Sequence, residues 1–312
     1  MPRVLVIAPN WIGDALMAQP LLARLKQSGA TIDVLAPEWV APVVHRMPEV
    51  DVVIAAPLRH GALQLGERWR LGRSLERRGY ETAYVLPHSW KSALVPFFAR
   101  IPKRIGYVGE MRYGLLNSIY QSVKASMPLH YARLAGGPDT PLGSPKLSVR
   151  EEEIRETRRR FGIEGGYIVL CPGAEYGPAK RWPYFKDLAA RLGTAVVLLG
   201  SRNDEQAAAG IPGKNLVGKT SLDEAIRLIA GASAVVSNDS GLMHVAAALG
   251  RPQVALFGSS SPEHTPPASA RARVLWLKLE CSPCFERECP LGHFRCMKEI
   301  TVEQVLAAMD KA

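Results

Sequence analysis

The chain has 312 residues, enough for two domains of ordinary size, and its 47% apolar and 22% charged residues are typical of a globular protein rather than a disordered one. No apolar run approaches the ~18 residues of a membrane span and no secretory signal is recognisable, so we expect a cytoplasmic protein. The formal net charge of +10 favours anionic partners: nucleic acid, an anionic membrane surface or a phosphorylated substrate.

Short apolar strands alternate with helical patterns in the first half of the chain, which predicts a parallel sheet with right-handed crossovers. The predicted strands are 4–8, 32–36, 52–55 and 82–86, and the predicted helices are 15–27, 66–78 and 92–100. Ligands bind such sheets at the carboxyl ends of the strands. We therefore expect the loops at residues 10–14 and 88–91 to lie at a binding edge.

The composition shifts to Gly, Pro, Ser and Thr between residues 136 and 145, which is typical of a linker. We place the domain boundary there, with an N-terminal domain of residues 1–145 and a C-terminal domain of residues 146–312. A second alternating series follows the charged helix 151–161. Its predicted strands are 167–171, 195–199, 215–217, 234–237 and 253–257, and its predicted helices are 184–192, 204–209, 222–231, 242–249 and 302–309. The pattern predicts an α/β protein of two Rossmann-like domains with a cleft between them.

A buried strand, a sharp turn and the start of a helix follow one another at residues 235–244. This order places Asp239, Ser240 and Gly241 at a helix N-terminus, where free N–H groups and the helix dipole attract an anion. The alternative interpretation is an ordinary helix cap followed by a glycine that permits packing.

Residues 171–183 form a Gly-rich loop with two adjacent cations, Lys180 and Arg181, before a helix. The loop has neither Walker A nor G-x-G-x-x-G spacing. Its cations still suit a departing diphosphate, whose charge they can neutralise without a metal ion. The alternative is a surface turn with solvated cations.

Asp14 ends the loop after the first strand and begins the first helix, so its carboxylate faces the predicted binding edge. Such a carboxylate can act as the general base that takes a proton from an attacking hydroxyl. The alternative is an N-terminal helix cap.

Together these segments resemble the ADP-heptose:lipopolysaccharide heptosyltransferases, most closely the heptosyltransferase II branch. The matched blocks include Ala8-Pro9-Asn10-Trp11-Ile12-Gly13-Asp14 and Asn238-Asp239-Ser240-Gly241-Leu242-Met243-His244, with others at 47–50, 61–63, 84–87, 91–96, 109–117, 172–175 and 180–183. The resemblance covers nearly the whole chain. It implies a GT-B fold and an inverting, metal-independent transfer of heptose from ADP-heptose onto the lipopolysaccharide inner core, as the second heptose.

The resemblance also implies roles for individual residues. Asp14 matches the general base, and Lys180 matches a phosphate-binding lysine. Either Asp204 or Glu205 matches the acidic residue that holds the adenosine ribose in the family, and the sequence does not separate the two. The full predicted donor site is Gly173, Ala174, Lys180, Arg181, Asp204, Glu205, Asp239, Ser240, Gly241 and His244.

The acceptor implied by the resemblance is a lipid A-linked oligosaccharide of Kdo and heptose, reached at the cytoplasmic face of the inner membrane by peripheral contact. We expect its phosphates or carboxylates to dock on Lys91, Arg104 and Arg112 in the N-terminal domain, although these side chains could equally be solvated surface cations. The alternatives are heptosyltransferase I or another ADP-sugar transferase. A nucleic-acid-binding protein is the rival from another class, but no known nucleic-acid-binding module occurs in the sequence.

Four cysteines, Cys281, Cys284, Cys289 and Cys296, lie in a tail segment at residues 281–296. Stable disulfides are not expected in a reducing compartment. A structural zinc held by four thiolates is one hypothesis; free thiols, a redox-labile disulfide and an iron–sulfur cluster are the others. In every case we expect the segment to shape the C-terminal domain and no cofactor to be needed for transfer.

Overall fold

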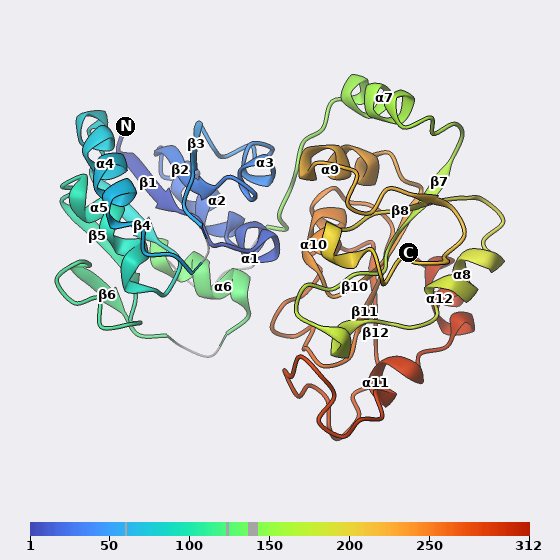
Figure 1. Ribbon diagram of the computed structural model, residues 1–312. Helices are drawn as coiled ribbons and strands as arrows, with labels where there is room; N and C mark the ends of the chain where they lie inside the picture. The colour runs from blue at the N-terminus through green and yellow to red at the C-terminus, as the bar shows by residue number, and fades with distance from the viewer. Residues whose placement is uncertain (60, 123–124, 137–142) are drawn as a thin grey trace. The chain divides into compact units, whose positions relative to one another are not determined.

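A computed structural model describes residues 1–59, 61–122, 125–136 and 143–312 (Figure 1). The chain divides into two compact units, Met1–Pro145 and Lys146–Ala312. Each unit contains one six-stranded sheet in which every strand pairing is parallel. The predicted α/β fold with two parallel sheets is confirmed.

The first unit alternates strands and helices along its described residues. Its strands are β1 (Arg3–Ile7), β2 (Thr31–Pro37), β3 (Val52–Ala56), β4 (Thr82–Val85), β5 (Lys103–Tyr107) and β6 (Ser118–Tyr120). Its α-helices are α1 (Ile12–Met17), α2 (Gln19–Gln27), α3 (Ala41–Val44), α4 (Leu65–Leu75), α5 (Leu94–Phe98) and α6 (Met127–Ala132), with short 3-10 helices η1 (Glu76–Arg78), η2 (Trp90–Ala93) and η3 (Arg133–Ala135).

The second unit repeats this alternation. Its strands are β7 (Tyr167–Cys171), β8 (Ala195–Leu198), β9 (Lys214–Asn215), β10 (Ala234–Asn238), β11 (Gln253–Phe257) and β12 (Ala272–Trp276). Its α-helices are α7 (Glu151–Arg160), α8 (Phe185–Arg191), α9 (Leu222–Ala230), α10 (Gly241–Ala248), α11 (Arg295–Lys298) and α12 (Val302–Met309), with 3-10 helices η4 (Pro178–Lys180) and η5 (Arg202–Asp204).

Both sheets have the same strand order. It is β3-β2-β1-β4-β5-β6 in the first unit and, read from the other edge, β9-β8-β7-β10-β11-β12 in the second. In this doubly wound order the direction of strand progression reverses between the first and fourth strands of a unit, and the crevice at their carboxyl ends binds ligands. The fold thus puts the expected binding edges at the ends of β1 and β4 and of β7 and β10.

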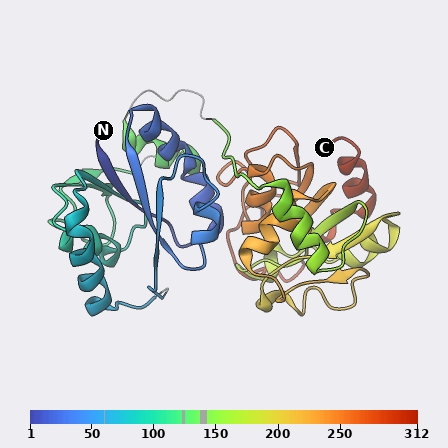
Figure 2. The ribbon, with the colours of Figure 1, turned by 90° about the horizontal axis from the view of Figure 1, so that it is seen from above.

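Helices cover both faces of each sheet (Figure 2). In the first unit α4 packs on α5, whereas α2 packs on α6; in the second unit α9 contacts α7 and α10, whereas α8 contacts α12. The strands between these layers are almost continuously apolar: β7 and β11 are buried at all five of their residues. Burial on both faces explains why these strands read as apolar runs. Among the described residues, no helix is long and apolar enough to cross a membrane.

Some elements differ from the sequence prediction. The strands β5, β6 and β12 were not predicted, because β5 and β12 carry basic residues and β6 has only three residues, so none presents an apolar run of strand length. The predicted helix 204–209 is wrong: the segment starts as the 3-10 helix η5 and continues as turns. Gly210 follows it with φ at 70°, a conformation that stops a helix.

Candidate functional site

Asn238, the last residue of β10, fastens the loop that follows β7. Its side-chain nitrogen donates hydrogen bonds to the carbonyls of Pro172 (2.8 Å) and Gly173 (3.3 Å), and its side-chain oxygen accepts one from the Trp182 N–H (3.0 Å). Asn238 is fully buried, so these bonds form out of water, where an unpaired amide would be costly. One side chain thereby holds both ends of the loop 172–182 against the end of β10.

Lys180 and Asp239 form a largely buried ion pair at this edge. The Lys180 ammonium lies 2.5 Å from Asp239 Oδ2, and the two side chains are 15% and 6% exposed. The Ser260 hydroxyl, on the loop after β11, donates to the same carboxylate oxygen at 2.6 Å. The structure therefore brings together two residues that the sequence predicted for one site, and it adds Ser260. The carboxyl end of β11, beside β10, is the signal that could have found this serine.

His244 lies in α10 and is 7% exposed. Burial lowers the pKa of His244 to about 4; the Asp239 charge acts to raise it and the Lys180 charge to lower it further. The imidazole is therefore neutral near pH 7. It adds no positive charge to the anion site that the sequence predicted here.

Ser240 is the N-cap of α10, and its side chain does not accept a cap hydrogen bond from the helix. Its hydroxyl lies 3.1 Å from that of Ser237 instead. The Ser240 side chain thus does not cap α10, as the alternative interpretation of this turn required. Arg181, in the loop after β7, donates to the Ala174 carbonyl at 3.4 Å.

The two acidic residues that the sequence could not separate have different surroundings. Asp204 is 7% exposed, and its Oδ2 accepts hydrogen bonds from the Ser201 N–H (2.9 Å) and hydroxyl (2.8 Å). A Cβ atom added to Gly173 would lie 2.1 Å from the Asp204 carboxylate, so only glycine fits at that loop position. Glu205 is exposed.

In the first unit, Asp14 lies in the first turn of α1, after the carboxyl end of β1. The N-cap of α1 is Trp11, three residues earlier, so Asp14 is not the cap residue that the alternative interpretation required. Burial raises the pKa of Tyr131 well above its usual value, and the Asp14 charge adds to this effect. Asp14 is thus a half-buried carboxylate close to α6 at the predicted edge.

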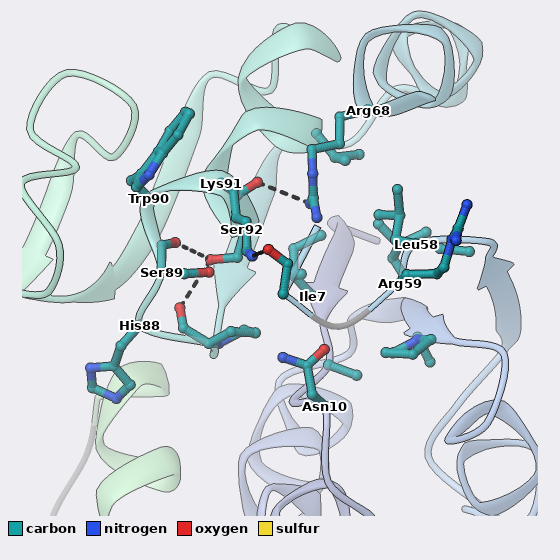
Figure 3. A pocket seen from close by; sticks show the side chains of 18 of the residues that line it. Ile7, Asn10, Leu58, Arg59, Arg68, His88, Ser89, Trp90, Lys91 and Ser92 are labelled. Carbon is teal, nitrogen blue, oxygen red and sulfur yellow. Dashed lines mark hydrogen bonds between the residues drawn. The ribbon is translucent and has the colours of Figure 1, made fainter. Parts of the chain in front are cut away.

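A pocket of about 340 Å³ opens at the carboxyl ends of the strands of the first unit. Figure 3 shows Trp90 and His88 on one side of it, Arg59 on the opposite side, and Asn10 between them. Its lining carries three cations, Arg59, Arg68 and Lys91, and one carboxylate, Glu110. Another hollow, of about 570 Å³, is lined only by charged side chains of α7 and lies on neither strand-end edge.

The three cations predicted for the acceptor fall in different places. Lys91 lines the pocket, and its ammonium donates to the Gly61 carbonyl at 2.7 Å. The Arg104 guanidinium donates to the carbonyls of Leu115 and Ile101, both at 2.6 Å, and burial lowers its pKa. Neither Arg104 nor Arg112 lines the pocket.

Arg112 corrects the sequence prediction most clearly. It is 1% exposed, so it has no surface to offer a ligand. Its guanidinium donates to the carbonyls of Tyr107 (2.6 Å) and Pro87, and burial lowers its pKa to about 10. Arg112 therefore supports the main chain that enters the pocket wall. Sequence reasoning missed Arg59, Arg68 and Trp90, because nothing local distinguishes them from surface residues.

The four cysteines of the tail segment are not disulfide-bonded: Cys281, Cys284 and Cys289 are half-buried and Cys296 is buried. Within the described residues, no group of three or more His, Cys, Asp or Glu side chains is placed to hold a metal ion. The structural zinc hypothesis therefore finds no support. Burial raises the pKa of Cys296 to about 11, and the three neighbouring thiols act in the same direction.

These two units have the architecture of a GT-B glycosyltransferase. The solved structure of the ADP-heptose lipopolysaccharide heptosyltransferase II of Escherichia coli matches with a TM-score of 0.88 and 43% identity, over 99% of this chain and 98% of that one. Residues 68–295 match the model of glycosyltransferase family 9 (heptosyltransferase), and the chain belongs to this family.

Curated relatives agree with this membership. Lipopolysaccharide heptosyltransferase 2 of Escherichia coli K12 is 45% identical over 99% of this chain and 97% of its own length. Lipooligosaccharide heptosyltransferase 2 of Haemophilus influenzae Rd is 43% identical over 88% of each chain. The family favours the transferase hypothesis over a nucleic-acid-binding protein.

The low pKa of His244 predicts a pH-dependent stability. Between about pH 6.5 and 4, an unfolded histidine is protonated while His244 in the folded protein is not, so stability is lost as the pH falls through this window. The loss attributable to His244 at pH 5 is about 2 kcal/mol. The fall in Tm from pH 7.5 to pH 5 should be smaller in His244→Gln than in the parent. The exposed His264→Gln is the control, and an equal fall in all three proteins would contradict the prediction.

Proposed function

We propose that this chain is an inverting heptosyltransferase that moves heptose from ADP-heptose to the inner core of lipopolysaccharide, as the second heptose. The observation that carries the proposal is the Lys180–Asp239 pair at the β7/β10 edge, in a chain of glycosyltransferase family 9. The curated relatives named lipopolysaccharide or lipooligosaccharide heptosyltransferase 2 favour this acceptor over that of heptosyltransferase I.

The transfer requires a base and a stabilised leaving group. We assign the base to Asp14: its carboxylate takes the proton of the acceptor hydroxyl as that oxygen bonds to the anomeric carbon of the heptose. The bond between that carbon and the diphosphate oxygen breaks, and ADP leaves with the electron pair. Attack from the side opposite the leaving group inverts the anomeric configuration.

The donor is assigned to the second unit. Lys180 and Arg181, with the N–H groups at the start of α10, offset the charge that develops on the departing diphosphate. Protein cations in this role make a divalent metal unnecessary. Glu205 is the better candidate for the ribose contact, because Asp204 is buried and its Oδ2 is bound by Ser201.

The acceptor is assigned to the first unit. The pocket lined by Arg59 and Lys91 suits a glycolipid that bears phosphates or Kdo carboxylates, because its lining carries more cations than carboxylates. Arg68, which is 6% exposed and donates to the carbonyls of Leu63 and Lys91, supports the pocket wall. Trp90 offers an apolar ring to a sugar face. For a lipid-linked acceptor we propose a cytoplasmic enzyme that makes peripheral contact with the inner membrane surface.

The test is a product assay with the purified chain, ADP-heptose and two defined acceptors, one with no heptose and one with a single heptose. Mass spectrometry should show one added heptose on the singly substituted acceptor. Addition to the acceptor without heptose would instead identify the first transfer, and addition to neither would reject the function.

In the same assay, Asp14→Asn keeps the size of the side chain but removes its ability to accept a proton. Turnover should fall by ~10²–10⁴-fold while ADP binding stays near that of the parent. Glu38→Gln, an exposed carboxylate in the same unit, is the matched control. Turnover of Asp14→Asn close to that of the parent would remove Asp14 from the role of base.

Lys91→Ala should raise the KM for the acceptor by about tenfold, the lower end of what a charge-assisted contact supplies, and leave the KM for ADP-heptose unchanged. Lys103→Ala removes an exposed cation outside the pocket and should leave both values at those of the parent. An unchanged acceptor KM in Lys91→Ala would place the docking face elsewhere.

A further inference from the structure

We propose that residues 281–294, the first part of the cysteine-containing segment, form a wall of the donor site and that Arg287 is a positioning residue for Lys180. The inference rests on the proposed function, because Lys180 is there the diphosphate-binding cation. In Figure 1 this segment is the orange-red loop that precedes α11. The sequence placed it only as a structural element of the domain.

The link between the two residues is the ring of Tyr176. The Lys180 ammonium lies 4.9 Å from the ring centroid, and the Arg287 guanidinium carbon lies 5.3 Å from it. The Tyr176 hydroxyl donates to the Phe285 carbonyl at 2.5 Å. The negative face of an aromatic ring attracts a cation, and both Lys180 and Arg287 lie against the Tyr176 ring. Arg287 and the hydrogen bond of the Tyr176 hydroxyl therefore fix the ring on which the Lys180 ammonium rests.

The main chain makes the same connection. The Ala179 N–H, next to Lys180, donates to the Arg287 carbonyl at 3.0 Å. Gly177 has φ at 144°, and a Cβ atom there would lie 2.5 Å from that carbonyl oxygen. Only glycine allows the two loops to approach this closely.

The segment is also tied to the loop that carries Ser260. The Phe285 N–H donates to the Ser259 carbonyl at 2.7 Å, and the Ser282 hydroxyl donates to the Gly258 carbonyl at 2.6 Å. Residues 281–294 thus contact the loops of both partners of Asp239, Lys180 and Ser260. The segment therefore fixes the geometry of the diphosphate site from outside the sheet.

If Arg287 acts on Lys180 through Tyr176, its substitution should affect phosphate binding alone. Arg287→Ala should weaken ADP binding by about three- to tenfold, because Lys180 loses its support and one positive charge is lost. Binding of adenosine, which has no phosphate, should not change. Arg287→Lys keeps the charge and should recover part of the loss.

The experiment is calorimetric titration of ADP and of adenosine into the parent, Arg287→Ala, Arg287→Lys, Tyr176→Leu and the double variant Tyr176→Leu/Arg287→Ala. In the Tyr176→Leu background, Arg287→Ala should cause a clearly smaller further loss, because the ring that couples the two sites is gone. Lys298→Ala is the matched control: it removes a cation that lies on Phe294 in the same region of the chain, 5.5 Å from the ring centroid, and should leave ADP binding unchanged.

Parent-like ADP binding by Arg287→Ala, an equal loss for adenosine, or fully additive effects in the double variant would each overturn the inference. Failure of the parent chain to bind ADP would instead reject the proposed function. The two failures are therefore distinguishable in one set of titrations.

Discussion

The buried carboxylate of Asp239 sets the arrangement of the second unit. A carboxylate with 6% exposure is stable only when charge and hydrogen bonds compensate for the water it has lost, and Lys180 and Ser260 supply them. Lys180 lies in the loop after β7 and Ser260 in the loop after β11, so their contacts with Asp239 hold the ends of β7, β10 and β11 together. Asn238, one residue earlier, holds the same β7 loop through hydrogen bonds to Pro172 and Trp182. For the proposed diphosphate ligand, a lysine already placed by its carboxylate partner reduces the entropy lost on binding.

The shared strand order gives each unit a crevice at the same topological position. The two crevices carry different chemistry, because their loops differ. The second unit presents a cation, a helix N-terminus and glycines that permit close approach, which suit a phosphate. The first unit presents a half-buried carboxylate after β1 and a pocket rich in cations, which suit a base and an anionic glycolipid. This division agrees with the two substrates of a glycosyltransferase.

The sequence predicted the fold class and the central strands because strands buried on both faces are apolar throughout. It also predicted that Lys180 and Asp239 lie at one edge of the second sheet, because each follows such a strand. It could not separate a cation that lines a pocket from a cation buried in the interior: Arg112 looks like Lys91 in sequence, yet its guanidinium is buried and binds the carbonyls of Tyr107 and Pro87. It could not reveal Arg287 either, because the role proposed for this residue depends on a contact with Tyr176, about 110 residues earlier in the chain. Four cysteines in one short segment suggested a metal site that the described residues do not form.

In the proposed transfer Lys180, rather than a divalent metal, neutralises the diphosphate, and the other donor-site assignments depend on this role. Calorimetric titration of ADP into the parent and Lys180→Ala, with and without a chelator, tests it directly, with the exposed Lys186→Ala as the control. A charge-assisted contact to phosphate contributes ~1.5–3 kcal/mol, so Lys180→Ala should bind ADP about one to two decades more weakly. The chelator should change neither the parent nor the control. Undiminished binding by Lys180→Ala, or parent binding that disappears with the chelator, would contradict the account.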